Sequence, residues 1–413
     1  MTTTKNNEHK KLNFSSEREQ SQVCLNSAEH EKNQGRKVLN VPNLRFPEFQ
    51  GEWEEKRLSE IADLFKGNGI SKEQLTDTGE PCILYGELYT KYKSEVISDI
   101  FSKTDIDTRK LVKSKANDVI IPCSGETAVD IATARCVPYD NILLGGDLNI
   151  IRLYDCDGSF MSYQLNGKRK YDIAKVAQGV SVVHLYGDHL KGVKTYNPCL
   201  EEQKKIAKLL SLLDERITTQ NKIIEDLKRL KYAISESLFK EVKGDVVMLS
   251  EICKISKGKQ INGEFLSEKG KYYVMNGGTE PSGYYNNYNV EANTISISEG
   301  GNSCGYVQFN TTPFWSGGHC YTIQNIVRGV DNLYLYHYLK SKEDAIMKLR
   351  IGSGLPNIQK KDLAMFKIKI PLAEQQKTIS TFLSSLERKT EIEEHILNAI
   401  QKEKLYLLQH MFI

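Results

Sequence analysis

The sequence lacks the short motifs that identify many enzymes. It has no glycine-rich phosphate loop closed by Gly-Lys-Ser/Thr, no Gly-x-Ser-x-Gly turn and no His-Glu-x-x-His helix. Gly67-Asn68-Gly69 lacks the third glycine of a dinucleotide-binding loop, and the eight histidines do not cluster at ligand spacing. We therefore expect a chain that performs no catalysis by itself and binds no metal.

Paired cysteines and long apolar runs are also absent. The nine cysteines are scattered and no two form a Cys-x-x-Cys pair, so neither a zinc site nor a disulfide framework is expected. No run of eighteen apolar residues could span a membrane, and the first ten residues have no apolar segment of a signal peptide. These absences favour a cytoplasmic protein.

Length and charge set only wide bounds on the function. A chain of 413 residues is too long for one ordinary core and suits two or three domains. Its formal net charge is +3, with 26% charged residues. This balance is compatible with a nucleic-acid surface but does not argue for one.

The most informative feature of the sequence is a stretch that occurs twice. At an offset of 173 residues, positions 198–239 align with positions 371–412 without a gap. The residues identical in both copies are, in the first copy, Pro198, Glu201, Gln203, Lys204, Ile206, Leu210, Ser211, Leu213, Ile223, Lys231 and Phe239. A chance match does not extend so far without an insertion.

Both copies have the apolar spacing of a long amphipathic helix, with apolar residues alternately four and three apart. A seam sustained over five heptads lets two helices wind around each other, and we expect the two copies to pair antiparallel. The residues predicted to pair them are Ile206, Leu210, Leu213, Ile217, Ile224 and Leu227 in the first copy, and Ile379, Leu383, Leu386, Leu397 and Ile400 in the second.

The segments before the helices are related to each other as well. Leu-Ser-Glu-Ile occurs at 58–61 and again at 249–252, and Lys66-Gly67 returns as Lys257-Gly258. Farther along, Ser124-Gly125 resembles Glu299-Gly300, and Gly145-Gly146 matches Gly317-Gly318. Because the offset falls from 191 to 173, the first segment has about 18 more residues than the second.

These repeats predict a chain of alternating domains and helices. We expect a disordered polar extension over 1–40, a first domain over 41–197, a helix over 198–243, a second domain over 244–370 and a helix over 371–413. Within the domains, strands are predicted over 118–122, 149–154, 272–275 and 294–298, and helices over 160–177 and 333–349. The predicted fold is α+β, with two related domains, two antiparallel coiled-coil helices and an approximate twofold axis.

The loops of both domains carry side chains able to contact base edges or phosphates. Basic runs could also hold backbone phosphates. A solvated loop is the plainer interpretation of each residue taken alone. The candidate DNA-binding residues are Lys66, Asn68, Ser124, Glu126, Thr127, Arg135, Lys168, Arg169 and Lys170 in the first domain, and Lys257, Lys259, Gln260, Glu299, Asn302, Ser303, Lys360 and Lys361 in the second.

Together these features resemble a known family, the specificity subunits of Type I restriction-modification enzymes. The resemblance rests on the opening Val-Pro-Asn-Leu-Arg-Phe-Pro-Glu-Phe at 41–49 with Trp53, and on the Leu-Ser-Glu-Ile start of both domains. It also rests on the doubled helix starts, Pro-Cys-Leu-Glu-Glu-Gln-Lys-Lys-Ile at 198–206 and Pro-Leu-Ala-Glu-Gln-Gln-Lys-Thr-Ile at 371–379. It covers the chain from about residue 41 to the end.

The resemblance implies that each domain is a target recognition domain that reads one half of a split DNA sequence, with the helices as a spacer. Two modification subunits, which are adenine methyltransferases, would dock on this chain, and restriction subunits would add ATP-driven cutting. S-adenosylmethionine, ATP and Mg would then be bound by those partners, and no cofactor by this chain.

Two other interpretations remain open from the sequence. One is a coiled-coil scaffold whose two domains bind proteins. The other is a methyltransferase or nuclease acting alone; Asn197-Pro198-Cys199-Leu200 resembles the Asn-Pro-Pro-Tyr of adenine methyltransferases but lacks the stacking aromatic residue.

Overall fold

The computed structural model describes residues 39–179, 182–352, 354 and 356–413, which divide into two compact units. The described part of the first unit is residues 39–179 and 182–206 with Gln409–Ile413, and that of the second unit is residues 207–352, 354 and 356–408. The predicted disordered extension over 1–40 falls almost wholly on residues 1–38, which lie outside the described residues.

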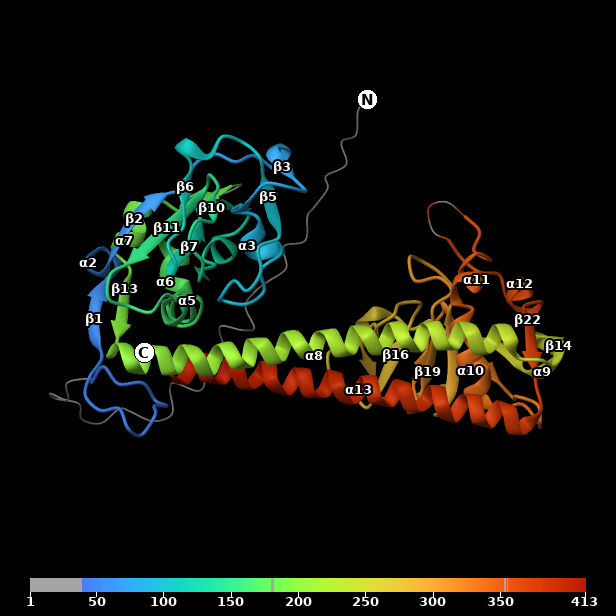
Figure 1. Ribbon diagram of the computed structural model, residues 1–413. Helices are drawn as coiled ribbons and strands as arrows, with labels where there is room; N and C mark the ends of the chain where they lie inside the picture. Colours follow the sequence, from blue (N-terminus) through green and yellow to red (C-terminus); the bar gives the residue numbers. More distant parts are fainter. Residues whose placement is uncertain (1–38, 180–181, 353, 355) are drawn as a thin grey trace, which may run out of the picture. The chain divides into compact units, whose positions relative to one another are not determined.

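The first unit is built on a four-stranded antiparallel sheet (Figure 1). Its strands, in spatial order, are β2 (Ala62–Lys66), β11 (Leu148–Leu153), β7 (Asp118–Pro122) and β9 (Arg135–Val137). All five residues of β7 are buried, as expected for a run rich in β-branched side chains at the centre of a sheet. The prediction of this strand is confirmed.

The remaining elements of the first unit surround that sheet. A five-stranded sheet has the order β3 (Leu75–Thr76), β5 (Ser102–Thr104), β4 (Glu80–Ile83), β10 (Leu143–Leu144), β6 (Val112–Lys113). Two strand pairs are β1 (Glu54–Arg57) with β13 (Lys194–Asn197) and β8 (Ser124–Gly125) with β12 (Val183–His184). The short helices are α2 (Leu58–Ile61), η1 (Lys72–Gln74), α3 (Glu87–Thr90), η2 (Thr108–Lys110), α4 (Ala128–Ile131), α5 (Gly158–Asn166), α6 (Lys170–Val176) and α7 (Gly187–Lys191).

The second unit repeats this plan with fewer elements. Its four-stranded sheet has the order β15 (Lys254–Lys257), β21 (Cys320–Gln324), β18 (Thr294–Ser298), β19 (Val307–Asn310). Its smaller sheet is β17 (Tyr284–Tyr285), β16 (Tyr272–Met275), β20 (Trp315–Ser316), and β14 (Asp245–Met248) pairs with β22 (Lys367–Ile370). The short helices are α9 (Leu249–Ile252), η3 (Gly263–Phe265), α10 (Asn332–Ser341), α11 (Glu343–Met347) and α12 (Lys360–Ala364).

The two sheets match strand by strand, which confirms that the domains are related. β2, β11, β7 and β9 correspond to β15, β21, β18 and β19, and in each unit the other sheet contains one parallel pair, β4 with β10 or β16 with β20. The additional strands β5 and β6 of the first unit lie between β4 and β7 in the sequence. Much of the extra length predicted for the first copy is therefore in this region.

Two predicted helices are each divided in two. The helix predicted over 160–177 is α5 followed by α6, and the one predicted over 333–349 is α10 followed by α11. The chain leaves helical geometry at Gly167, with φ −84° and ψ −110°, and at Lys342, with φ −108° and ψ 16°. The apolar spacing did not indicate these breaks because both members of each pair bury side chains, such as Ile173 and Ile346, in their unit's core.

The two long helices are α8 (Leu200–Glu241) and α13 (Ala373–His410). Within the second unit they run antiparallel, since Lys404 of α13 lies 2.5 Å from Asp214 and Glu387 lies 2.6 Å from Lys231 (Figure 1). This confirms the predicted antiparallel pair. The eleven residues predicted to form the seam are all buried or half-buried. No helix of the described residues is both long and apolar enough to cross a membrane.

The starts of the long helices show why their sequences are alike. Gln203 accepts a hydrogen bond from the Asp157 amide at 2.9 Å and donates to the Pro198 carbonyl at 2.9 Å. In the second unit, Gln376 accepts from the Asp331 amide at 2.8 Å and donates to the Pro371 carbonyl at 2.9 Å. Asp157 and Asp331 are the N-caps of α5 and α10. One glutamine therefore ties each long helix to a capped helix of its own unit.

Candidate nucleic-acid interface

In the first unit, polar loop residues meet beyond the ends of β2 and β7. Lys66 ends β2, and its ammonium lies 5.7 Å from the ring centroid of Tyr186. Ser124 follows β7, pairs with His184 in the short β8–β12 ladder, and donates to Asp147 at 3.2 Å. These side chains bring donors and acceptors together at one edge of the four-stranded sheet, as contacts to base edges require.

The corresponding edge of the second unit carries a tighter cluster. Lys257 ends β15, and its Nζ lies 2.5 Å from Oε1 of Glu299, the first residue after β18. The Tyr321 hydroxyl donates to the same oxygen at 3.1 Å, and Nδ1 of His319 lies 3.5 Å from Oε2. Burial, followed by the nearby carboxylate, raises the pKa of Tyr321, so its hydroxyl remains a donor.

Backbone hydrogen bonds establish which residues of the two edges correspond. The Cys123 amide donates to the Asp147 carbonyl, as the Glu299 amide does to that of His319. The carbonyls of Cys123 and Glu299 then accept from the amides of Leu185 and Ile358. Glu299 therefore corresponds to Cys123, so the sequence alignment of Ser124 with Glu299 is wrong by one residue. The error arose because the alignment paired the glycines of the two loops, Gly125 and Gly300, which the structure sets one residue out of register.

Several predicted first-domain residues have structural partners. Asn68 donates to the Lys110 carbonyl at 2.7 Å, and Thr127 caps α4 by accepting from the Asp130 amide at 3.1 Å. Arg135 is only 8% exposed and donates to the carbonyls of Leu88, Ala134 and Tyr92. Glu126 is exposed beside Thr127. The structure thus brings Lys66 and Ser124 to the sheet edge and puts Arg135 in the interior.

The basic run at 168–170 lies beside the end of the chain. Arg169 donates to the Ile413 carbonyl at 2.8 Å and lies 5.3 Å over the Tyr196 ring. Burial is the main cause that lowers the pKa of Lys170, and only Lys168 of the three is exposed. This run therefore contributes to packing as well as to surface charge.

The other second-domain candidates lie on loops and at a helix start. Lys259 and Gln260 follow β15, Asn302 and Ser303 follow Glu299, and Lys360 and Lys361 begin α12. All except the half-buried Ser303 are exposed. Sequence reasoning missed Asp147, His184, Tyr186, His319 and Tyr321. Asp147 and His319 directly follow the repeated Gly-Gly pairs, and that position was the signal that could have identified them.

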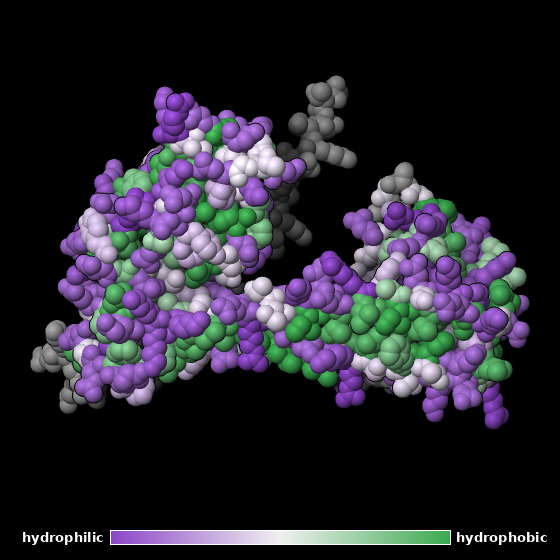
Figure 2. Space-filling model, viewed as in Figure 1, coloured by the Kyte–Doolittle hydropathy of each residue, from purple (hydrophilic) through white to green (hydrophobic). Residues whose placement is uncertain are grey.

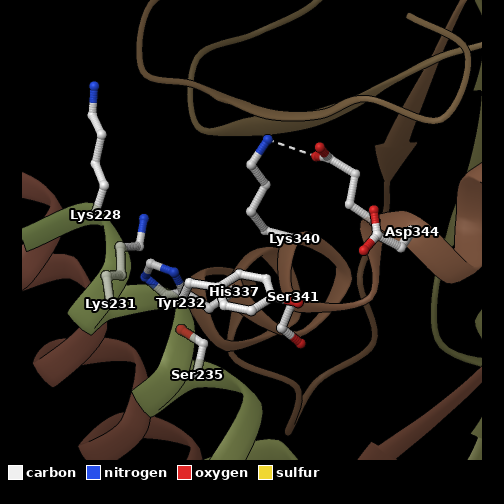
Figure 3. Close-up of a pocket in the computed structure, with 9 residues that line it drawn as sticks. Lys228, Lys231, Tyr232, Ser235, His337, Lys340, Ser341 and Asp344 are labelled. Atoms are coloured by element: carbon white, nitrogen blue, oxygen red, sulfur yellow. Dashed lines mark hydrogen bonds and ion pairs between the residues drawn. The ribbon is translucent and has the colours of Figure 1, made fainter. Parts of the chain in front are cut away.

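A separate pocket of about 250 Å³ lies between α8 and the α10–α11 region (Figure 3). Three lysines line it, but each pairs with a carboxylate: Lys228 with Glu394, Lys231 with Glu387 and Lys340 with Glu343, all at 2.6 Å. His337, at the pocket wall, lies 2.9 Å from the Ser384 hydroxyl, and burial lowers its pKa to about 4. These pairs leave little net positive charge for an anion.

Comparison with known proteins identifies the family. The family model described as the Type I restriction modification DNA specificity domain matches residues 50–229 and 241–402. The chain is 26% identical to the Type I restriction enzyme MjaVIII specificity subunit of Methanocaldococcus jannaschii over 409 residues, 87% of this chain and 91% of that one. It is 35% identical to the "Putative type I specificity subunit S.MpnORF638P" of Mycoplasma pneumoniae over 147 residues, 35% of this chain and 38% of that one.

Solved structures agree on the fold. A crystal structure of the Type I restriction-modification system S subunit from M. genitalium matches with a TM-score of 0.67 and 20% identity, over 90% of this chain and 99% of that one. The domain model matches the chain twice, which agrees with the equivalent sheets of the two units and with the antiparallel helices. The chain therefore belongs to the specificity subunits of Type I restriction-modification systems and carries two copies of their DNA specificity domain.

Proposed function

We propose that this chain reads a two-part target in double-stranded DNA, with one half-site for each unit. The observation that carries the proposal is the repeated sheet edge, where equivalent positions of one scaffold hold different residues: Cys123 and Asp147 in the first unit, Glu299 and His319 in the second. Two domains that share a fold but differ in their loop residues suit a target whose two halves differ in sequence.

The long helices are proposed to set the number of base pairs between the half-sites. The 38 residues of α13 are about 57 Å long at roughly 1.5 Å per residue, compared with about 34 to 36 Å for one turn of B-DNA. Half-sites about one helical turn apart are therefore within the reach of such a spacer.

The same helices are proposed to bind the partner subunits that perform the chemistry. Large apolar side chains stand exposed on both helices, among them Leu212, Ile223 and Leu230 of α8 and Phe382, Ile392 and Leu405 of α13. Figure 2 shows hydrophobic residues gathered along the long helices of the second unit. Exposed apolar surface of this kind favours protein contacts. Two methyltransferase subunits would bind S-adenosylmethionine, and restriction subunits would bind ATP and Mg.

The test is DNA affinity as a function of salt, measured by fluorescence anisotropy on the complete complex and on the chain alone. The logarithm of the affinity should fall linearly with that of the salt concentration. A Lys360→Gln/Lys361→Gln variant, which loses two phosphate contacts, should make that slope shallower by about two. Lys228→Gln, which changes a helix lysine paired with Glu394, should leave it unchanged. Absence of DNA binding at low salt would favour the protein-binding scaffold instead.

A further inference from the structure

The cluster around Glu299 joins a buried carboxylate to exposed donors. The Glu299 side chain is 9% exposed, whereas that of Lys257 is 51% and that of His319 is 63% exposed. Oε1 accepts hydrogen bonds from both Lys257 and Tyr321. Oε2 is buried, and no described residue donates a hydrogen bond to it.

This arrangement differs from that of an ion pair that only stabilises a fold. A buried carboxylate with a structural role normally has partners on both oxygens. Here one oxygen instead faces the ring of His319, which lies at the surface. Tyr321 holds the carboxylate from the interior side, because its hydroxyl lies 3.1 Å both from Oε1 and from the Ile358 carbonyl. The result is a fixed anion beneath two exposed nitrogen-bearing side chains.

The first unit keeps the lysine and changes its surroundings. Lys66 ends β2 as Lys257 ends β15, and the following Gly67 and Gly258 amides donate to the matching carbonyls of Leu148 and Cys320. Cys123, in the place of Glu299, is buried and cannot anchor an ammonium as a carboxylate does. A position that differs between two copies of one scaffold is suited to determine what each copy reads.

We propose that Lys257 reads a guanine in the major groove, and that Glu299, facing His319, is the positioning residue that aims it. The proposal rests on the proposed function, since it names the base contact of the second domain. Lysine donates to the O6 and N7 acceptors of guanine. The adjacent carboxylate of Glu299 offsets the charge of Lys257 and repels a phosphate. This favours a base edge over a phosphate as the group that Lys257 contacts. Held by Glu299, the ammonium also loses little side-chain freedom on binding.

The experiment is methylation-site mapping with the complete complex, supported by thermal unfolding of each variant. Lys257→Gln should relax the requirement for guanine at one position of one half-site by at least about tenfold and leave the other half-site unchanged. Lys257→Arg should keep the guanine, because arginine reads the same acceptors. Glu299→Gln should relax the same position to a smaller extent. Lys66→Gln, the matched change in the first unit, should leave the second half-site intact.

Three results separate the possibilities. If Lys257→Gln weakens binding to all sequences equally and lowers the salt slope by about one, Lys257 contacts a phosphate and the proposal is wrong. If both variants lower the unfolding temperature and leave the target sequence unchanged, the cluster only stabilises the fold, and the proposal is again wrong. If the unaltered complex shows no sequence preference, the proposed function itself fails.

Discussion

Gln220 and Glu393 occupy the same position in the two copies of the long helix, and they hydrogen-bond to each other. The Gln220 amide donates to the Glu393 carboxylate and, at 3.1 Å, to its carbonyl oxygen. The ion pairs Asp214–Lys404 and Lys231–Glu387 flank this contact and are themselves related by the 173-residue offset. The acid–lysine pair is therefore formed twice, once with the acid on α8 and the lysine on α13, and once the other way round. A duplicated helix that pairs antiparallel with its copy requires this symmetry.

We predict that Gln220→Leu alone destabilises the second unit, because Glu393, only 7% exposed, loses a donor. The double variant Gln220→Leu/Glu393→Leu should recover most of that loss, since an apolar pair leaves no buried charge. Urea denaturation measures both, with Asn221→Leu on the exposed face as the control. A double variant less stable than the single one would contradict this reading of the contact.

The end of the chain is predicted to stabilise the first unit. Phe412 is 2% exposed, and its ring centroid lies 5.3 Å from that of Phe160 and 6.4 Å from that of Trp53. Phe412→Ala should cost about 3–5 kcal/mol in the free energy of unfolding. Leu405→Ala, at a residue 57% exposed, should cost little. Equal losses in calorimetry would show that the terminal ring does not belong to the core.

His337 should make the second unit less stable at mildly acidic pH. Its pKa is about 4 in the folded chain and 6.5 ordinarily, so below pH 6.5 the unfolded chain binds a proton that the folded chain does not. The free energy of unfolding therefore falls as the pH drops from 6.5 toward 4, by ~2 kcal/mol between pH 7 and pH 5. Burial alone would raise the pKa of Glu387, but Lys231, His337 and Tyr336 together lower it, so Glu387 stays ionised between pH 7 and pH 5.

The check is urea denaturation at pH 7 and pH 5. His337→Asn should remove most of the difference between the two values, whereas His395→Asn, at an exposed helix position, should keep it. If the His337 variant retains the full pH dependence, another group is responsible.

Much of the fold could be predicted because it depends on local patterns that occur twice. The runs at 118–122, 272–275 and 294–298 are strands with the predicted bounds, since β-branched and aromatic residues between turns favour strands. The cluster of polar residues at the sheet edge of the second unit was harder to predict. Lys257, Glu299, His319 and Tyr321 meet only because β15, β18 and β21 are adjacent, and nothing local in the sequence pairs them. The burial of Arg135 was equally hard to predict, because two of the carbonyls that hold it inside the fold belong to the distant residues Leu88 and Tyr92.

The spacer role of the helices predicts a defined change in the target. Seven residues inserted after Gln220, with seven inserted opposite before Glu393, keep the heptad seam and lengthen the pair by about 10 Å. The gap between the half-sites should then grow by about three base pairs, at roughly 3.4 Å each. Seven residues inserted at the exposed turn at Asp77 should leave the gap as it was. If the number of base pairs between the half-sites stays the same in the helix variant, the helices do not act as the spacer.

The central claim is that each unit reads its own half of the target, and exchange of one unit tests it most directly. Residues 249–367 would be replaced by those of a relative with a different target, and the methylated sites of the resulting complex would be mapped. The account predicts that one half-site takes the relative's sequence while the other half-site stays the same. A chimera in which both half-sites change, or neither does, would contradict it.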